Sequence, residues 1–242
     1  MNKLYGAILG DLAGQPFEFP AKGGPRTGVQ IHNPDSHFTD DTIMTLATAS
    51  YLLGDYPSFE MAYKTFGLRY QGDYYGKMFG TWIMTPPGVL LDSFGNGCLM
   101  RISPIMYMEQ ENRLPLILDS VLTSHRHEVS IRSVIKLDDE YYNEWFPYIG
   151  TVEPFKRFTS RADDTINFCI KLTGSVSGTV NTIIKAIECG GDTDTNASIC
   201  GELSNYRLND LTKEDIDYVD SKLDNYLLDI LKRFNEKFGG QQ

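Results

Sequence analysis

The sequence predicts an all-α fold, in which one domain spans residues 1–242 and long loops carry the function. Apolar residues recur at helical spacing in several segments, and the alternating pattern that is typical of strands is nearly absent. No repeat, composition shift or obvious linker divides the chain. A chain of 242 residues can bury a sizeable core as a single domain.

The charge and the cysteine pattern narrow the class of protein. A formal net charge of −10 argues against a protein that binds nucleic acid through its phosphate backbone. It is compatible with an anionic small ligand that is held through a bound cation. The four cysteines form no C-x-x-C pair, and residues 1–11 resemble neither a signal peptide nor a membrane span. We therefore expect a cytoplasmic protein with reduced, buried thiols and no membrane partner.

Residues 4–13 predict a buried helix that Gly14 and Pro16 end. Gly6 and Gly10 lie four residues apart in it and would allow another helix to approach closely. Glu18 follows between two phenylalanines. It is either a surface residue beside a hydrophobic anchor or a carboxyl in an apolar pocket with a raised pKa, and local sequence favours the first reading.

The next motif is Thr39-Asp40-Asp41-Thr42, which follows a loop over residues 20–36. Apolar residues after it recur at helical spacing, so Thr39 or Asp40 begins a helix. Adjacent aspartates at that position suit the helix dipole. Flanked by hydroxyls, they also form half of a site for a divalent metal.

The middle of the chain has weaker patterns. We expect residues 66–98 to form an irregular, loop-rich surface that ends in Gly95-Asn96-Gly97. This tripeptide is either a plain turn or a set of backbone N–H groups that cradles a phosphate. Residues 114–124 predict a helix with Pro115 in its first turn. Residues 136–160 show no clear period.

Two further polar motifs are weighed against a metal site. His125 and His127 have no third histidine or cysteine nearby in the sequence, so a hydrogen-bonding role for His125 is favoured over zinc. Asp163-Asp164-Thr165 repeats the earlier aspartate pair without its leading threonine. We interpret it as the start of a helix and not as a set of ligands.

The stretch around Asp192 and Asp194 organises the prediction of function. Each aspartate is followed by a threonine, and two glycines precede the pair. Such oxygen ligands suit Mg²⁺, Mn²⁺ or Ca²⁺, although a capped helix without metal has the same pattern. An EF-hand would need Gly and Glu where Ala197 and Leu203 stand. A phosphotransfer pair would follow a strand, whereas residues 180–187 predict a helix.

Two features of the C-terminal part concern packing. Ala197 and Gly201 lie four residues apart and permit close contact with another helix. From Thr212, with Asp215 three residues on, one long amphipathic helix is predicted as far as Gly239.

Together these motifs resemble the ADP-ribosylglycohydrolase family, which includes the dinitrogenase-reductase-activating glycohydrolases. The matching pieces occur in the family's order: Gly6…Gly10-Asp11-x-Ala13-Gly14-x-Pro16-x-Glu18, Thr39-Asp40-Asp41-Thr42, Gly95-Asn96-Gly97-x-x-Met100-Arg101-x-x-Pro104, Ser124-His125-x-His127 and Gly190-Gly191-Asp192-Thr193-Asp194-Thr195-x-Ala197-x-Ile199-x-Gly201. The chain departs from the family after Gly201, where Glu202 replaces a small residue, and between residues 127 and 165, which form a brief segment.

The resemblance implies an all-α fold with two metal ions, usually Mg²⁺, with Mn²⁺ as an alternative. The ligands that it implies are Thr39, Asp40, Asp41, Asp192, Asp194 and Thr195. It places Glu18 at the scissile bond as the catalytic residue, and it implies substrate contacts from Gly95, Asn96, Gly97 and His125.

The function expected from the resemblance is hydrolysis of the bond between ADP-ribose and a modified target, with arginine in a protein as the first candidate. Two alternatives stay open: an ADP-ribose-binding or toxin-blocking module of the immunity type, and a hydrolase of a small ADP-ribose derivative. Nucleic acid is expected as a partner only where it is itself the modified substrate.

Overall fold

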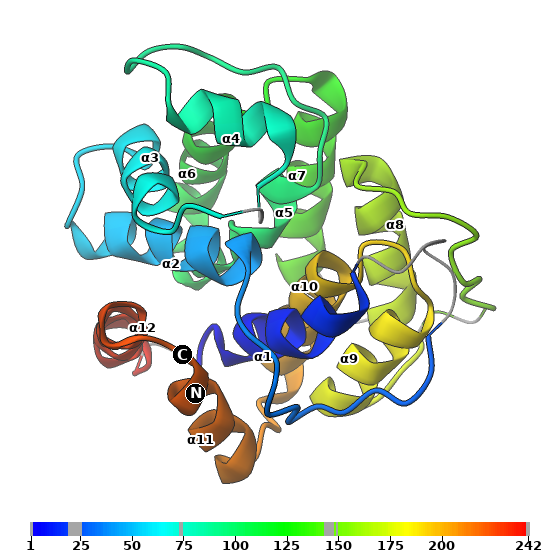
Figure 1. The fold of residues 1–242 in the computed structure, drawn as a ribbon. Coiled ribbons are helices and arrows are strands. Elements are labelled where there is room, and N and C mark those ends of the chain that lie inside the picture. Colours follow the sequence, from blue (N-terminus) through cyan, green and yellow to red (C-terminus); the bar gives the residue numbers. More distant parts are fainter. Residues whose placement is uncertain (1, 19–25, 73–74, 143–147, 149, 241–242) are drawn as a thin grey trace.

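The computed structural model describes residues 2–18, 26–72, 75–142, 148 and 150–240 (Figure 1). Its α-helices are α1 Tyr5–Gly14, α2 Asp40–Leu53, α3 Phe59–Arg69, α4 Lys77–Ile83, α5 Gly97–Met100, α6 Gln110–Leu122, α7 Glu128–Tyr142, α8 Ala162–Thr173, α9 Thr179–Glu188, α10 Thr193–Leu208, α11 Lys213–Lys222 and α12 Asn225–Phe238. Within the described ranges, extended pairing is limited to two isolated bridges, Asp92 with His125 and Gly95 with Arg161. The all-α prediction is confirmed.

The centre of the molecule is the contact between α1 and α10, which lie side by side in Figure 1. A Cβ atom added to Gly10 would lie 2.2 Å from the carbonyl oxygen of Ala197, and one added to Gly6 would lie 2.4 Å from that of Gly201. No real side chain tolerates such distances, so the two backbones touch because these positions lack bulk. The predicted close approach is confirmed, and it fixes the C-terminal end of α1 beside the first turn of α10.

Glu202 shows what the departure after Gly201 does. Its buried carboxylate accepts hydrogen bonds from the backbone N–H groups of Leu4 at 2.9 Å and Ala7 at 3.1 Å, and from the hydroxyl of Tyr107 at 2.5 Å. It therefore satisfies donors in the first turn of α1, where the adjoining residue provides no side-chain cap. Glu202 therefore connects α10 to α1 at the end of the helix pair that lies opposite the acidic motifs.

The other helices surround this pair. α9 and α8 pack against α10, α11 packs against α1, and α2 packs against α3 and α12 (Figure 1). α7 packs against both α6 and α8. All four cysteines are buried free thiols, as predicted. Among the described residues, no helix combines the length and the apolar character that crossing a membrane requires.

The prediction of an irregular surface over residues 66–98 is wrong in part. The end of α3 and all of α4 lie in this range, and both Trp82 and Ile83 are buried. The indole N–H of Trp82 donates to the carbonyl oxygen of Val89 at 2.7 Å, which anchors the following loop to α4. The many glycines hide a helix of only seven residues from pattern analysis.

Two other helices differ from the prediction. α6 begins at Gln110, so Pro115 lies inside the helix and not in its first turn. Its first turn is polar and shows no apolar period. Part of the range that could not be assigned, residues 136–160, belongs to α7, which begins at Glu128.

The C-terminal segment is two helices and not one. Thr212 and Asp215 form the predicted capping box of α11. Leu223 is extended, with φ −83° and ψ 144°, and Asp224 then caps α12 by accepting from the N–H groups of Tyr226 and Leu227. The apolar spacing continues across the break, because both helices bury their faces in the same core.

Candidate active site

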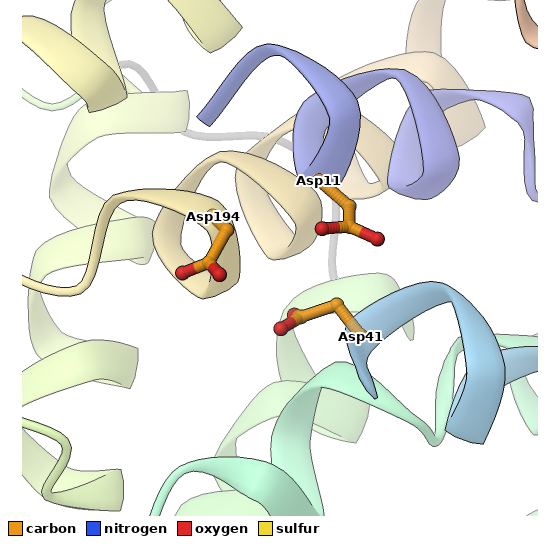
Figure 2. Close-up of side chains that lie close together, drawn as sticks. All are labelled: Asp11, Asp41 and Asp194. Carbon is orange, nitrogen blue, oxygen red and sulfur yellow. The ribbon is translucent and has the colours of Figure 1, made fainter. Parts of the chain in front are cut away.

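The acidic motifs meet at three helix ends. Asp11 lies near the end of α1, Asp41 in the first turn of α2 and Asp194 in the first turn of α10 (Figure 2). Their carboxylate oxygens lie within 4.8 Å of one another, and the same holds for Glu18, Asp192 and Asp194. Asp41 and Asp194 therefore lie close together although they are more than 150 positions apart in the sequence.

Asp11 holds the start of α2. Its carboxylate accepts hydrogen bonds from the backbone N–H and the hydroxyl of Thr39, at 2.9 and 2.7 Å, and from the same two groups of Thr42, at 3.1 and 2.5 Å. Asp11 therefore caps α2 from another helix and fixes where Asp40 and Asp41 lie. Sequence analysis gave it no role, although two threonines around an aspartate pair require an acceptor somewhere.

The first turn of α10 brings the second acidic motif into place. Gly190 and Gly191 have φ angles of 77° and 80°, a region that favours glycine, and they turn the chain into the helix. The Thr195 hydroxyl then donates to Asp41 at 3.0 Å, and its N–H donates to Asp194 at 2.9 Å. Thr195 thus connects the two predicted sets of ligands directly.

The electrostatics of the cluster are those of carboxyl groups crowded together away from solvent. Burial, and next the charges of neighbouring carboxylates, raise the pKa of Asp40, Asp41 and Asp194 well above the ordinary value. Burial raises the pKa of Asp192 to about 6. Oxygen Oδ1 of Asp41 is buried without a hydrogen-bond partner among the described residues. Crowded carboxylates with an orphaned oxygen fit a hard divalent ion, which would offset their repulsion.

Glu18 lies half-buried at the edge of the cluster. Burial is the largest cause that raises its pKa to about 9, followed by the charge of Asp194 and a hydrogen bond with it. Of the two local readings, the structure therefore favours the carboxyl in a pocket over the surface residue.

A cavity of about 450 Å³ opens above the acidic cluster. Every predicted site residue except Thr39, which is only 1% exposed, lines it. The Gly95–Gly97 turn forms a wall of this cavity. Within that wall the Asn96 side chain donates to Asp192 at 2.9 Å and to the Thr165 hydroxyl at 3.2 Å. Asn96 therefore positions a predicted metal ligand, a role that its local sequence did not indicate.

Sequence analysis also missed an aromatic mouth to the cavity. The residues that form it are Tyr75, Phe79, Phe94 and Phe158, together with Met78. Phe94 and Phe158 keep 45% and 42% of their surface exposed. Large apolar side chains around a cavity with a few convergent polar groups are typical of a ligand-binding cleft.

The motifs that were set aside lie outside the acidic cluster. Asp163 is exposed and pairs with the guanidinium of Arg161 at 3.0 Å, at the start of α8. His127 accepts from the N–H of Val129 at 3.2 Å and precedes α7. Asp163 lies in the first turn of α8, as predicted, and neither Asp163 nor His127 belongs to a group of converging metal-binding side chains among the described residues.

A comparison with protein families shows to which family the chain belongs. The family model for ADP-ribosylglycohydrolase matches residues 2–135, more than half of the chain, so the chain belongs to the ADP-ribosylglycohydrolase family. The match includes Glu18, the Thr39–Thr42 motif and the Gly95–Gly97 turn, and it ends before Asp192. Family membership supports hydrolysis of ADP-ribosylated substrates in general.

The fold is also similar to that of a solved structure. That structure is described as an ADP-ribosylglycohydrolase-related protein complex. The two have a TM-score of 0.67 and 18% sequence identity, and the match covers 96% of this chain and 98% of that one. At this identity the likeness shows the fold alone. The comparison with curated proteins found no match.

Proposed function

We propose that this protein is a metal-dependent hydrolase that cleaves the glycosidic bond between ADP-ribose and a modified target, with arginine in a protein as the first candidate. The observation that carries the proposal is the convergence of Asp41, Asp192 and Asp194 with Glu18 at the floor of one cavity. A passive binder would have no need for crowded carboxylates whose charges repel one another.

The metal ligands in this proposal are Thr39, Asp40, Asp41, Asp192, Asp194 and Thr195. They would hold two ions, Mg²⁺ or alternatively Mn²⁺. Bound ions of this kind polarise oxygen atoms and position water and ribose hydroxyls. The Thr39 hydroxyl donates its proton to Asp11 and accepts a hydrogen bond from the N–H of Asp41 at 3.3 Å, which leaves one lone pair of its oxygen for a metal ion.

Glu18 is the proposed acid–base group. Cleavage at the anomeric carbon of ribose passes through a state with oxocarbenium character, so a carboxyl group must pass a proton to the leaving atom or take one from water. Its half-buried place beside Asp194 raises its pKa, which favours holding a proton until it is needed.

The wall and the mouth would receive the rest of the ligand. A cavity of about 450 Å³ lies within the size range of small-molecule sites. We assign the diphosphate to the turn at Gly95, Asn96 and Gly97, with His125 beside it. The buried, reduced thiols support a cytoplasmic location.

The decisive assay measures ADP-ribose release from arginine-, serine- and nucleic-acid-linked substrates, with Mg²⁺ and with EDTA. We expect release from at least one linkage, lost in EDTA. Titration with free ADP-ribose accompanies it. Binding without release from any linkage would favour the binding or toxin-blocking module, and release only from small derivatives would favour the third alternative.

A further inference from the structure

Three buried side chains form a hydrogen-bonded chain behind the wall of the cavity. Arg101, Ser124 and His125 are 1%, 0% and 4% exposed. The guanidinium of Arg101 donates from NH1 to the Ser124 hydroxyl at 3.0 Å, and that hydroxyl lies 2.9 Å from Nδ1 of His125. Both Arg101 and His125 line the cavity.

The chemistry of the three groups sets the direction of each bond. A guanidinium only donates, so Ser124 accepts from Arg101 and keeps its own proton for another acceptor. Among the described residues, the acceptor that lies within reach of the Ser124 hydroxyl is Nδ1 of His125. If Nδ1 carried the proton instead, the serine hydroxyl proton would lack this partner, and a buried donor without a partner destabilises the folded state.

Arg101 is held rigidly enough to impose this order. Its NH2 donates to the carbonyl oxygen of Ser120 at 2.8 Å, and its guanidinium lies 4.1 Å from the centre of the Tyr63 ring. The same ring's hydroxyl lies 2.7 Å from that of Ser120. Burial, and next the charge of Arg101, lower the pKa of His125 well below its ordinary value, so the imidazole stays neutral.

The other ring nitrogen faces the Gly95–Gly97 turn. Nε2 lies 3.8 Å from the position that a Cβ would occupy at Gly95, and 3.5 Å from the corresponding position at Gly97. Glycine at both places leaves the N–H of this nitrogen close to the wall of the cavity. An oxygen atom of a ligand at that wall would therefore meet a donor.

We propose that Arg101 and Ser124 are positioning residues that fix His125 as the neutral tautomer with its proton on Nε2. His125 then presents a permanent N–H donor, and not a base, to an oxygen of the substrate beside the turn. The tautomer stands on the geometry alone, whereas its use with substrate rests on the proposed function.

Nuclear magnetic resonance of the protein labelled with ¹⁵N-histidine tests the tautomer directly at pH 7. The spectrum of His125→Gln identifies the His125 signals among the four histidines. We expect a protonated Nε2 and an unprotonated Nδ1 in the wild type. A proton on Nδ1 of His125, or on both of its ring nitrogens, overturns the proposal whether or not the Ser124 variants fold.

Variants test the positioning role. Ser124→Ala should give a mixture of tautomers and weaken ADP-ribose binding roughly three- to tenfold, the value of one neutral hydrogen bond. Ser124→Thr, which restores the hydroxyl, should recover both. Thr123→Ala is the matched control. The Thr123 hydroxyl donates at 2.8 Å to the Ser120 carbonyl oxygen, which also accepts from Arg101, and it is not itself one of the three hydrogen-bonded groups.

A double-mutant cycle separates positioning from general damage. Ser124→Ala should add almost nothing to the loss of affinity in His125→Gln, because both changes act through one donor. Additive losses, or an unchanged tautomer in Ser124→Ala, contradict the proposal. If the wild type binds no ADP-ribose, the proposed function fails, while the histidine spectrum still decides the tautomer.

Discussion

The floor and the wall of the cavity have opposite electrostatic designs. The floor gathers Asp40, Asp41, Asp192 and Asp194, whose pKa values are all raised, with burial as the largest cause. The wall around Arg101, Ser124 and His125 instead links buried polar groups by hydrogen bonds, although Nε of Arg101 lacks a partner among the described residues. Carboxylates crowd together in the floor, whereas donors and acceptors alternate in the wall, so we expect cations to complete the floor and a substrate oxygen to complete the wall.

The largest expected effect is on the floor. Asp194 belongs to both groups of converging carboxylates, so Asp194→Ala should abolish divalent-metal binding and turnover while the helical fold survives. Calorimetry measures Mg²⁺ binding, and circular dichroism measures the helical content. Asp163→Asn, at the exposed start of α8, is the control and should stay within a few-fold of wild type. Unchanged Mg²⁺ affinity in Asp194→Ala would count decisively against the assignment.

Glu18→Gln should separate chemistry from binding. Glutamine nearly keeps the shape of the side chain but exchanges no proton, so kcat should fall at least about a hundredfold. Affinity for ADP-ribose should change far less. Single-turnover release and calorimetry are the measurements, and turnover at the wild-type rate would show that Glu18 is not the acid–base group.

Asp11→Asn probes the residue that sequence analysis missed. The amide would donate where the carboxylate accepts the Thr39 hydroxyl, which reverses that bond and turns the threonine proton elsewhere. Changes of this kind beside a ligand lower metal affinity by about 10–100-fold. Asp215→Asn, which alters a carboxylate that caps α11, should lower stability without lowering Mg²⁺ affinity. Equal Mg²⁺ affinities in the two variants would contradict this role for Asp11.

The smallest expected effect is on stability against pH. A carboxyl group whose pKa is raised in the folded state stabilises the protein at low pH. That contribution is lost as the pH rises from the pKa of the unfolded state to the pKa of the folded state. For Asp192 this window runs from 3.8 to about 6, and for Glu18 from 4.5 to about 9. In EDTA, thermal melting should therefore occur at lower temperature at pH 8 than at pH 5, and saturating Mg²⁺ should reduce the difference. A melting temperature that rises over this range in EDTA would contradict the raised pKa values.

The acidic motifs were more predictable from sequence than the residues that hold them in place. The Thr39–Thr42 and Asp192–Asp194 motifs each place carboxylates and hydroxyls within a few adjacent residues, so the sequence alone indicates oxygen ligands for a divalent metal. The role of Asp11 depends on a helix that begins 29 residues later, and the bond from Asn96 to Asp192 spans 96 residues. Neither local pattern contains its partner. In the fold, glycine spacing revealed the contact of α1 with α10, whereas glycine abundance concealed α4, and shared core packing concealed the break between α11 and α12.

The most direct measurement of the central claim is a calorimetric titration of Mg²⁺ into the wild-type protein freed of metal. If the floor is a metal centre, binding should saturate at about two ions per chain, and the heat should disappear in Asp194→Ala but persist in Asp163→Asn. A wild-type protein that shows no saturable binding of Mg²⁺ or Mn²⁺ would contradict the claim that cations complete the floor.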